Sequence, residues 1–220
     1  MAFPHKIAAL GGDLRIAYID RPPKSDPRSV ILLIHGFPQT SYQYHHVIEP
    51  FAASGYRVVV PDYRGTGLSS KPASDFRKTT MAKDLAELLD HLGIPEPVHV
   101  VGHDIGGMIA YAFATRHEHR TAFVVWGECP LPGTTAHEED RTVHGVQQFH
   151  FLFHSVPDLP EALVTGREEM YLSHLFDKLT HNRSAISEQD LQVPGSGHYV
   201  AEENPDGFVK AVLGFIAAAS

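Results

Sequence analysis

Four short runs of apolar residues constrain the fold of this chain more than any other feature of its sequence. They read VILLI at 30–34, RVVV at 57–60, VHVV at 98–101 and FVVW at 123–126, and helical patterns separate them. Continuous apolar runs rich in β-branched residues are typical of strands in a parallel sheet that is covered on both faces. The order of elements therefore predicts an α/β fold with right-handed crossovers.

Patterns on either side of these runs complete the predicted core. Residues 5–19 have the pattern of an opening hairpin with a Gly-Gly turn. Apolar residues at helical spacing over 81–92 predict a helix, and Gly93 ends it. Near the end of the chain, Asn204 and Pro205 predict the cap and first residue of a last helix with one apolar face.

The pattern changes from about 134 to 191, where the strand signals vanish. Apolar residues space as one helix over 143–153 and as another over 170–179. We interpret this stretch as a helical cap inserted after the fourth strand, and extra core helices are the alternative. The predicted organisation is a first part of the core at 1–133, an incomplete cap at 134–191, and a return to the core at 192–220.

Composition excludes several classes of protein. The formal net charge of −8 argues against a nucleic-acid binder. The sequence contains no run of 18 apolar residues, so we expect no membrane span. The single cysteine, Cys129, rules out an internal disulfide. The first residues lack the pattern of a signal peptide, so we expect a cytoplasmic protein. The 16 histidines are scattered and predict neither a metal site nor a cofactor, and the oligomeric state stays open.

The densest motif of the chain is VVGHDIGGM at 100–108. A strand, then G-x-D-x-G, then an apolar helix is the pattern of a nucleophile elbow with Asp104 in the place of the nucleophile. Any side chain at Gly102 or Gly106 would collide across such a tight turn, so both small positions are expected to be glycine. The alternative is an ordinary aspartate in a glycine-rich turn.

An aspartate nucleophile implies a particular reaction. Asp104 would attack an electrophilic saturated carbon and displace oxygen or halide, which leaves an ester of its own carboxylate on the enzyme. Activated water must then cleave that ester at the carbonyl carbon of Asp104. This second step needs a base and an oxyanion hole.

Three further segments offer these groups. HGFP at 35–38 follows the first buried strand, so the backbone N–H groups of Phe37 and Ile105 are the candidate oxyanion hole. His198, in the turn PGSGH, is the candidate base. Glu128 directly follows the fourth strand and is the candidate acid that orients His198. Its alternatives are a plain loop carboxylate at 128 or Asp140 as the acid.

Taken together, these motifs resemble the α/β-hydrolase superfamily, in particular its branch of epoxide hydrolases and haloalkane or haloacid dehalogenases. The resemblance implies an aspartate nucleophile, a histidine base, an acid after a late core strand, a helical cap and a small-molecule substrate. The matching segments are HGFPQTSY (35–42), DYRGTGLSSKP (62–72), GHDIGG (102–107), ECPLPG (128–133) and PGSGHYVAEENP (194–205).

Within this branch the resemblance indicates an epoxide-hydrolase-like member. Haloacetate dehalogenases carry arginines after the nucleophile, whereas Ile105 and Met108 stand here. The cap position that supplies a proton donor in epoxide hydrolases corresponds to His150, although a histidine on an apolar helix face is an equal alternative. Tyr171 is a weaker candidate donor. The implied substrate pocket comprises His35, His103, His150, Phe151 and Tyr171.

The resemblance also shows where the chain departs from its family. Ser187 and Asp190 form a helix-capping pair, but Pro194 and two glycines stop the helix almost at once. Relatives continue here with another cap helix and the late core strands, so a segment after Gln192 is expected to be missing. The alternatives to an active epoxide-hydrolase-like enzyme are a shortened, catalytically impaired form with at most binding activity, or a dehalogenase-type hydrolase.

Overall fold

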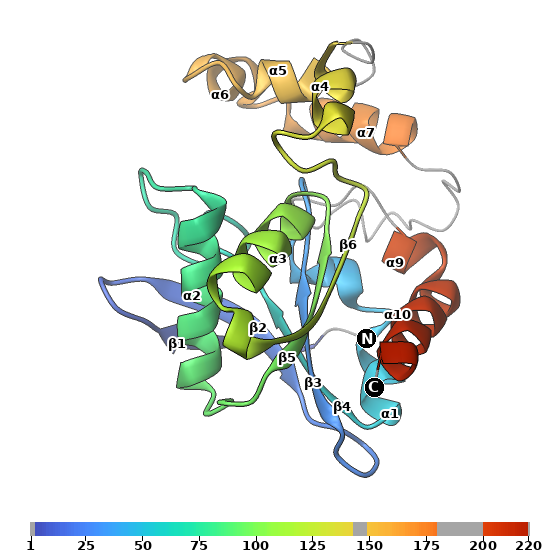
Figure 1. Cartoon of the computed structure of the whole chain (residues 1–220). Coiled ribbons are helices and arrows are strands. Elements are labelled where there is room, and N and C mark those ends of the chain that lie inside the picture. Colours follow the sequence, from blue (N-terminus) through green and yellow to red (C-terminus); the bar gives the residue numbers. More distant parts are fainter. Residues whose placement is uncertain (1–2, 143–148, 180–199, 220) are drawn as a thin grey trace.

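The computed structural model describes residues 3–142, 149–179 and 200–219 of the chain. Its centre is a six-stranded sheet in the order β1-β2-β4-β3-β5-β6, with helices on both faces (Figure 1). All four apolar runs form strands, as predicted, and the residues that precede them form the predicted hairpin. The strands are β1 (Lys6–Ala9), β2 (Arg15–Arg21), β3 (Ser29–Ile34), β4 (Tyr56–Pro61), β5 (Val98–His103) and β6 (Thr121–Gly127).

The pairing of the strands makes the sheet mostly parallel. β1 and β2 pair antiparallel, β2 pairs antiparallel with β4, and the remaining neighbours β4, β3, β5 and β6 run parallel. Ile34 on β3 is opposite Gly102 on β5, and Gly102 is opposite Trp126 on β6. The segments that leave these three strands therefore start side by side at one edge of the sheet.

Helices cover both faces because their apolar sides match the two faces of the buried strands. α2 (Lys78–His91) and α3 (Ile105–Arg116) pack on one face, while α1 (Ile48–Ala53) and α10 (Pro205–Ala219) pack on the other (Figure 1). Gly93, with a φ of 63°, follows the end of α2 as predicted. The predicted start of α10 is also observed, and Asn204 caps it by accepting a hydrogen bond of 3.0 Å from the Gly207 N–H.

Four helices follow β6 and lie beyond the carboxyl ends of the strands (Figure 1). α7 confirms the second helix predicted for this region. The helix predicted over 143–153 is described only from residue 149, and the helices α4 and α6 were not predicted. The four helices are α4 (Thr135–Thr142), α5 (Phe149–Phe153), α6 (Leu159–Val164) and α7 (Glu168–Leu179).

The last part of the chain returns to the core. The short helix α9 (Val200–Glu203) precedes α10, and the described part of the chain also contains the short 3-10 helices η1 (Ser41–Tyr44) and η2 (Glu118–Arg120). The capping pair, the junction at Gln192 and His198 lie outside the described residues. The predicted boundaries of the three parts remain predictions. No helix in the described ranges has both the length and the apolar character needed to cross a membrane.

Beside β6 lies an apolar groove. Among the described strands, β6 pairs only with β5 and so forms one edge of the sheet. The groove has a volume of about 440 Å³, and Trp126 is 43% exposed beside it. It is lined by Val124, Val125, Trp126, Phe208, Ala211, Val212 and Phe215, from β6 and α10.

Candidate active site

Asp104 occupies the tight turn between β5 and α3. Its φ of 53° and ψ of −126° are strained for a residue with a side chain, and such strain is concentrated at functional sites. The two glycines that the motif requires are explained by close contacts. A Cβ atom on Gly102 would lie 2.2 Å from the Gly106 carbonyl oxygen, and one on Gly106 would lie 2.1 Å from that of Ile34. The turn is therefore a nucleophile elbow in its geometry.

Backbone groups from both neighbouring strands hold Asp104 in place. The Phe37 N–H, from the loop after β3, donates a hydrogen bond of 2.8 Å to Asp104 Oδ1. The Asp104 N–H donates one of 3.0 Å to the carbonyl of Gly127 at the end of β6. Because Asp104 is only 5% exposed, its carboxylate is largely shielded from water and keeps one oxygen fixed by an amide.

The negative charge of Asp104 reaches three neighbouring groups. Burial raises the pKa of the Tyr63 hydroxyl, and the charge of Asp104 adds to that rise. Burial together with the charge of Asp104 raises the pKa of the Cys129 thiol to about 12. Burial lowers the pKa of Lys78, at the start of α2, and the charge of Asp104 opposes this shift. Lys78 on α2 and the buried Tyr63 in the loop after β4 therefore both interact electrostatically with the carboxylate of Asp104.

Gln43 on η1 stabilises the elbow through two hydrogen bonds, and no sequence pattern predicted it. Its Oε1 accepts a hydrogen bond of 3.0 Å from the Gly36 N–H, and its Nε2 donates one of 2.9 Å to His103 Nδ1. The second bond assigns the ring proton of His103 to Nε2. One buried amide therefore connects the loop that carries Phe37 to the residue before Asp104. No motif marks a glutamine in this role, because its partners are distant in sequence.

His35 and His103, two residues of the predicted substrate pocket, are both buried. His35 Nδ1 donates a hydrogen bond of 3.0 Å to the Gly36 carbonyl, and its ring stacks on Tyr63 with centroids 4.3 Å apart. Burial lowers the pKa of His35, and the nearby charge of Asp62 opposes that shift. Both histidines are bonded within the protein, and contact of either with a substrate stays a prediction.

Aromatic side chains from α5 and the turn after it lie close to Phe37. The rings of Phe37 and the buried His150 on α5 are nearly parallel, with centroids 6.4 Å apart, and Phe151 stacks on His150. His154, which the sequence analysis did not single out, meets Phe37 edge-on at 5.1 Å. Its Nε2 lies 2.7 Å from the Tyr171 hydroxyl on α7. Both candidate proton donors, His150 and Tyr171, therefore belong to the aromatic group that covers the Phe37 loop.

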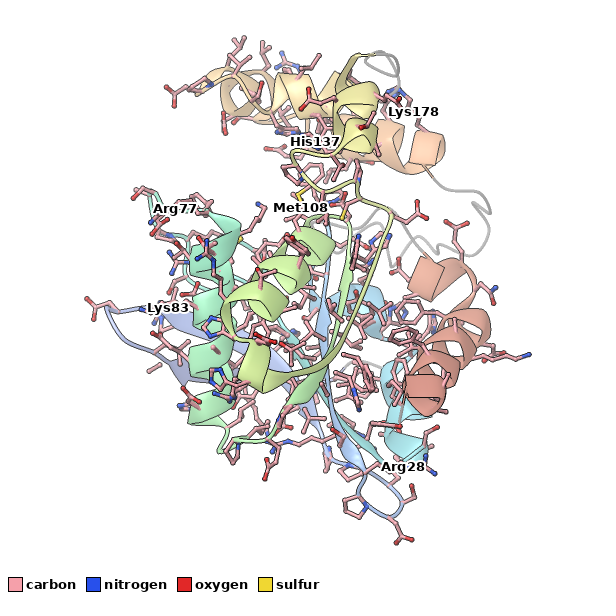
Figure 2. All side chains as sticks on the ribbon, viewed as in Figure 1. Arg28, Arg77, Lys83, Met108, His137 and Lys178 are labelled. Carbon is pink, nitrogen blue, oxygen red and sulfur yellow. The ribbon has the colours of Figure 1, made fainter. Side chains whose placement is uncertain are left out.

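Figure 2 shows the side chains of the described residues in the view of Figure 1. Met108, in the first turns of α3, lies at the end of the core that faces α4 to α7, whereas Lys83 lies on α2 and Arg77 directly precedes that helix. Burial lowers the pKa of His154, and burial also raises that of Tyr171. Partial burial thus favours the uncharged forms of both members of this hydrogen-bonded pair.

The other predicted catalytic groups with described positions are Ile105 and Glu128. Ile105 is the first residue of α3, so its amide directly follows Asp104 in the turn. Glu128 directly follows β6, has a φ of 58° and is exposed. Glu128 and Asp104 both lie at the carboxyl ends of the strands, because the residues before them, Gly127 and His103, are opposite each other in the sheet. The roles of Glu128, Ile105 and His198 stay predictions.

A cavity of about 690 Å³ adjoins the site at Phe37. It opens among the loops after β3 and β4, and Asp104 is not one of the described residues that line it. Its wall mixes aromatic and aliphatic side chains with polar ones, and it carries the acidic Asp62 beside the basic Lys71 and His5. The lining comprises His5, Phe37, Pro38, Gln39, Thr40, Tyr42, Asp62, Tyr63, Gly65, Thr66, Gly67, Leu68 and Lys71.

Comparisons with known proteins agree with this geometry. Residues 29–153 match a family model described as alpha/beta hydrolase fold. The chain is 35% identical to the soluble epoxide hydrolase of a Corynebacterium strain over 167 residues. The aligned residues make up 73% of this chain and 57% of that protein. The chain is also 39% identical over 135 residues to epoxide hydrolase B of Mycobacterium tuberculosis, covering 60% of this chain and 37% of that one.

A solved structure extends the likeness to nearly the whole chain. The crystal structure of Cfl2 from Burkholderia cenocepacia superposes with a TM-score of 0.76 at 28% identity, covering 98% of this chain and 70% of the other. The chain spans about half the length of the curated relatives that it matches.

Proposed function

The chain belongs to the alpha/beta hydrolase family, and from this premise we propose that it hydrolyses a small organic epoxide through an ester intermediate on Asp104. The observation that carries the proposal is the hydrogen bond of 2.8 Å from the Phe37 N–H to Asp104 Oδ1 at a strained elbow. A carboxylate that is shielded from water and oriented by a backbone amide is suited to attack on carbon. The names of the two curated relatives support an epoxide as the substrate.

In the proposed first step, Oδ2 of Asp104 attacks one carbon of the epoxide ring. A carbon–oxygen bond forms to Oδ2, and the bond from that carbon to the epoxide oxygen breaks, so the negative charge moves to the epoxide oxygen. A proton from the cap neutralises this oxygen. His150 is one candidate donor, since it is buried and its ring lies over that of Phe37. Tyr171 is the other, through its contact with His154.

In the proposed second step, water attacks the carbonyl carbon of the Asp104 ester. Oδ1 is then the carbonyl oxygen, and it acquires negative charge in the tetrahedral intermediate. The Phe37 N–H that already holds Oδ1 stabilises this charge, with the amide of Ile105 as the proposed second donor. His198 removes the proton of the water and Glu128 orients His198. The ester bond then breaks, His198 passes its proton to the leaving oxygen, and the diol departs. The remaining proton of the water leaves the acid at Asp104 and returns to the cap donor, which restores the carboxylate.

A second candidate, an impaired form with at most binding activity, is favoured by the state of the sheet edge. Glu128 is exposed, and Trp126 beside it is 43% exposed along the apolar groove between β6 and α10. An acid in open water orients a histidine poorly, because solvent competes for its hydrogen bonds. In that case an ester forms on Asp104 but is cleaved slowly.

A single-turnover experiment in water labelled with heavy oxygen tests the proposal. Excess protein is mixed with styrene oxide, and both the diol and the peptide that contains Asp104 are analysed by mass spectrometry. The ester route places the label in the carboxylate of Asp104, since water attacks there. Label in the diol alone contradicts the proposal, as does undiminished turnover by the Asp104→Ala variant. A stable adduct on Asp104 without diol supports the impaired form.

A further inference from the structure

A buried hydrogen bond joins two segments that lie far apart in the sequence. Gln39 Nε2 donates to Glu202 Oε2 over 2.8 Å, although 163 positions separate the two residues. Gln39 belongs to the loop after β3 and comes shortly after Phe37. Glu202 lies on α9, the helix that begins shortly after His198 in the chain. The bond thus links the loop that holds Asp104 Oδ1 to the helix that follows the candidate base.

The surroundings of this bond show that the carboxylate is not a solvated surface group. Gln39 is 2% exposed and Glu202 is 5% exposed. His45 Nδ1 lies 4.0 Å from Glu202 Oε1 and donates a hydrogen bond of 2.7 Å to the Tyr42 carbonyl. Burying a carboxylate is costly unless hydrogen bonds or charges compensate for lost water, and here an amide and an imidazole approach it.

Apolar packing alone already attaches this end of the chain to the core. Ala201, next to Glu202, is 2% exposed, and Phe208 on α10 contacts Tyr44 and Phe51 with ring centroids 6.1 and 6.3 Å apart. Such contacts are non-directional and permit small rotations and shifts of a short helix. A hydrogen bond has a preferred distance and angle, so the Gln39–Glu202 pair restricts the setting of α9 relative to the Phe37 loop.

We propose that Gln39 and Glu202, with His45 beside them, are positioning residues for the second half of the reaction. They fix the start of α9, which follows the candidate base His198 in the sequence, against the loop whose Phe37 N–H holds Oδ1 of Asp104. This inference rests on the proposed function. Attack of Asp104 on the epoxide does not depend on α9, whereas cleavage of the ester does.

The inference predicts an effect on one half-reaction only. Gln39→Leu removes the donor, so the alkyl-enzyme should form at a rate within about twofold of the native chain, while its hydrolysis slows roughly 10- to 100-fold. The ester on Asp104 then accumulates, and quenched samples show it by mass spectrometry. The exchanged pair Gln39→Glu with Glu202→Gln keeps one carboxylate and one amide in contact, so hydrolysis should largely recover. Asp206→Asn, an exposed change on the neighbouring helix α10, is the matched control.

The outcomes separate positioning from simple destabilisation. Equal loss of both half-reactions in Gln39→Leu, or no recovery in the exchanged pair, overturns the inference. If the native chain forms no ester, the proposed function fails, and amide hydrogen exchange over residues 201–209 then decides the inference. Faster exchange in Gln39→Leu that the exchanged pair reverses supports the positioning contact, and unchanged exchange refutes it.

Discussion

Asp104 and Glu128 follow neighbouring parallel strands, and both have a positive φ, 53° and 58°, yet their surroundings differ sharply. Asp104 is 5% exposed and is held by backbone groups from the strands on both sides. Glu128 is exposed at the end of β6, which pairs only with β5 among the described strands. The two strand ends are thus alike in backbone conformation, but the carboxylate of Asp104 is buried and hydrogen-bonded whereas Glu128 is exposed to solvent.

The difference teaches that a catalytic position depends on its neighbours more than on its own turn. β5 lies between β3 and β6, so the Phe37 amide reaches Asp104 from one side and the Gly127 carbonyl from the other. Within the described part of the chain, β6 has a neighbouring strand on one side only, so its end receives backbone contacts from fewer neighbours. An interior strand end is therefore preorganised for chemistry, and an edge strand end is not.

The largest expected effect contrasts the two carboxylates directly. Asp104→Asn should prevent ester formation and lower kcat by roughly 10³-fold or more, because it removes the proposed nucleophile. Glu128→Gln should leave ester formation intact and slow only its hydrolysis, by ~10²–10⁴-fold, if Glu128 orients the base. Rapid quenching with mass spectrometry of the Asp104 peptide measures both steps. Native hydrolysis in Glu128→Gln would show that the exposed carboxylate has no such role.

A second contrast compares the same substitution at the two strand ends. The methyl group of Gly106→Ala would lie 2.1 Å from the Ile34 carbonyl oxygen, whereas nothing lies within 4 Å of a Cβ atom on Gly127. We expect Gly106→Ala to lower the free energy of unfolding by about 3 kcal/mol. Gly127→Ala should stay within about 0.5 kcal/mol of the native chain. Urea unfolding followed by circular dichroism measures both, and equal losses would contradict the contrast.

Local patterns predicted the elbow and the elements around it. The strand before Asp104, the glycines at 102 and 106 and the apolar helix behind them are contiguous in sequence, so short-range sterics identify them. The apolar faces of α2, α7 and α10 were predicted for the same reason, since burial imposes a period on the sequence. The short polar helix α4 escaped prediction because it has no apolar stripe to reveal it.

The contacts that complete the site could not be predicted from one sequence. Gln43 bonds to residues on two different segments, and Gln39 meets Glu202 across 163 positions. The pair of His154 and Tyr171 joins the turn after α5 to α7. Each contact depends on how distant elements pack, and a lone glutamine or histidine carries no periodicity or motif that reports such packing.

The smallest expected effect concerns pH and a third strand end, at His35 after β3. Burial lowers the pKa of His35 from its ordinary value of 6.5, and the charge of Asp62 opposes this shift only in part. The unfolded chain therefore binds a proton near pH 6.5 that the folded chain does not yet bind. The contribution of His35 to stability is present above that pH and is lost as the pH falls below it.

Urea unfolding from pH 7.5 to about 5 should thus show a free energy of unfolding that declines toward acid, with a shallower decline in His35→Gln. His91→Gln, an exposed change at the end of α2, is the matched control and should keep the native slope. Identical slopes in all three proteins would mean that the interior strand end at His35 titrates like an open one, which would weaken the contrast between interior and edge positions.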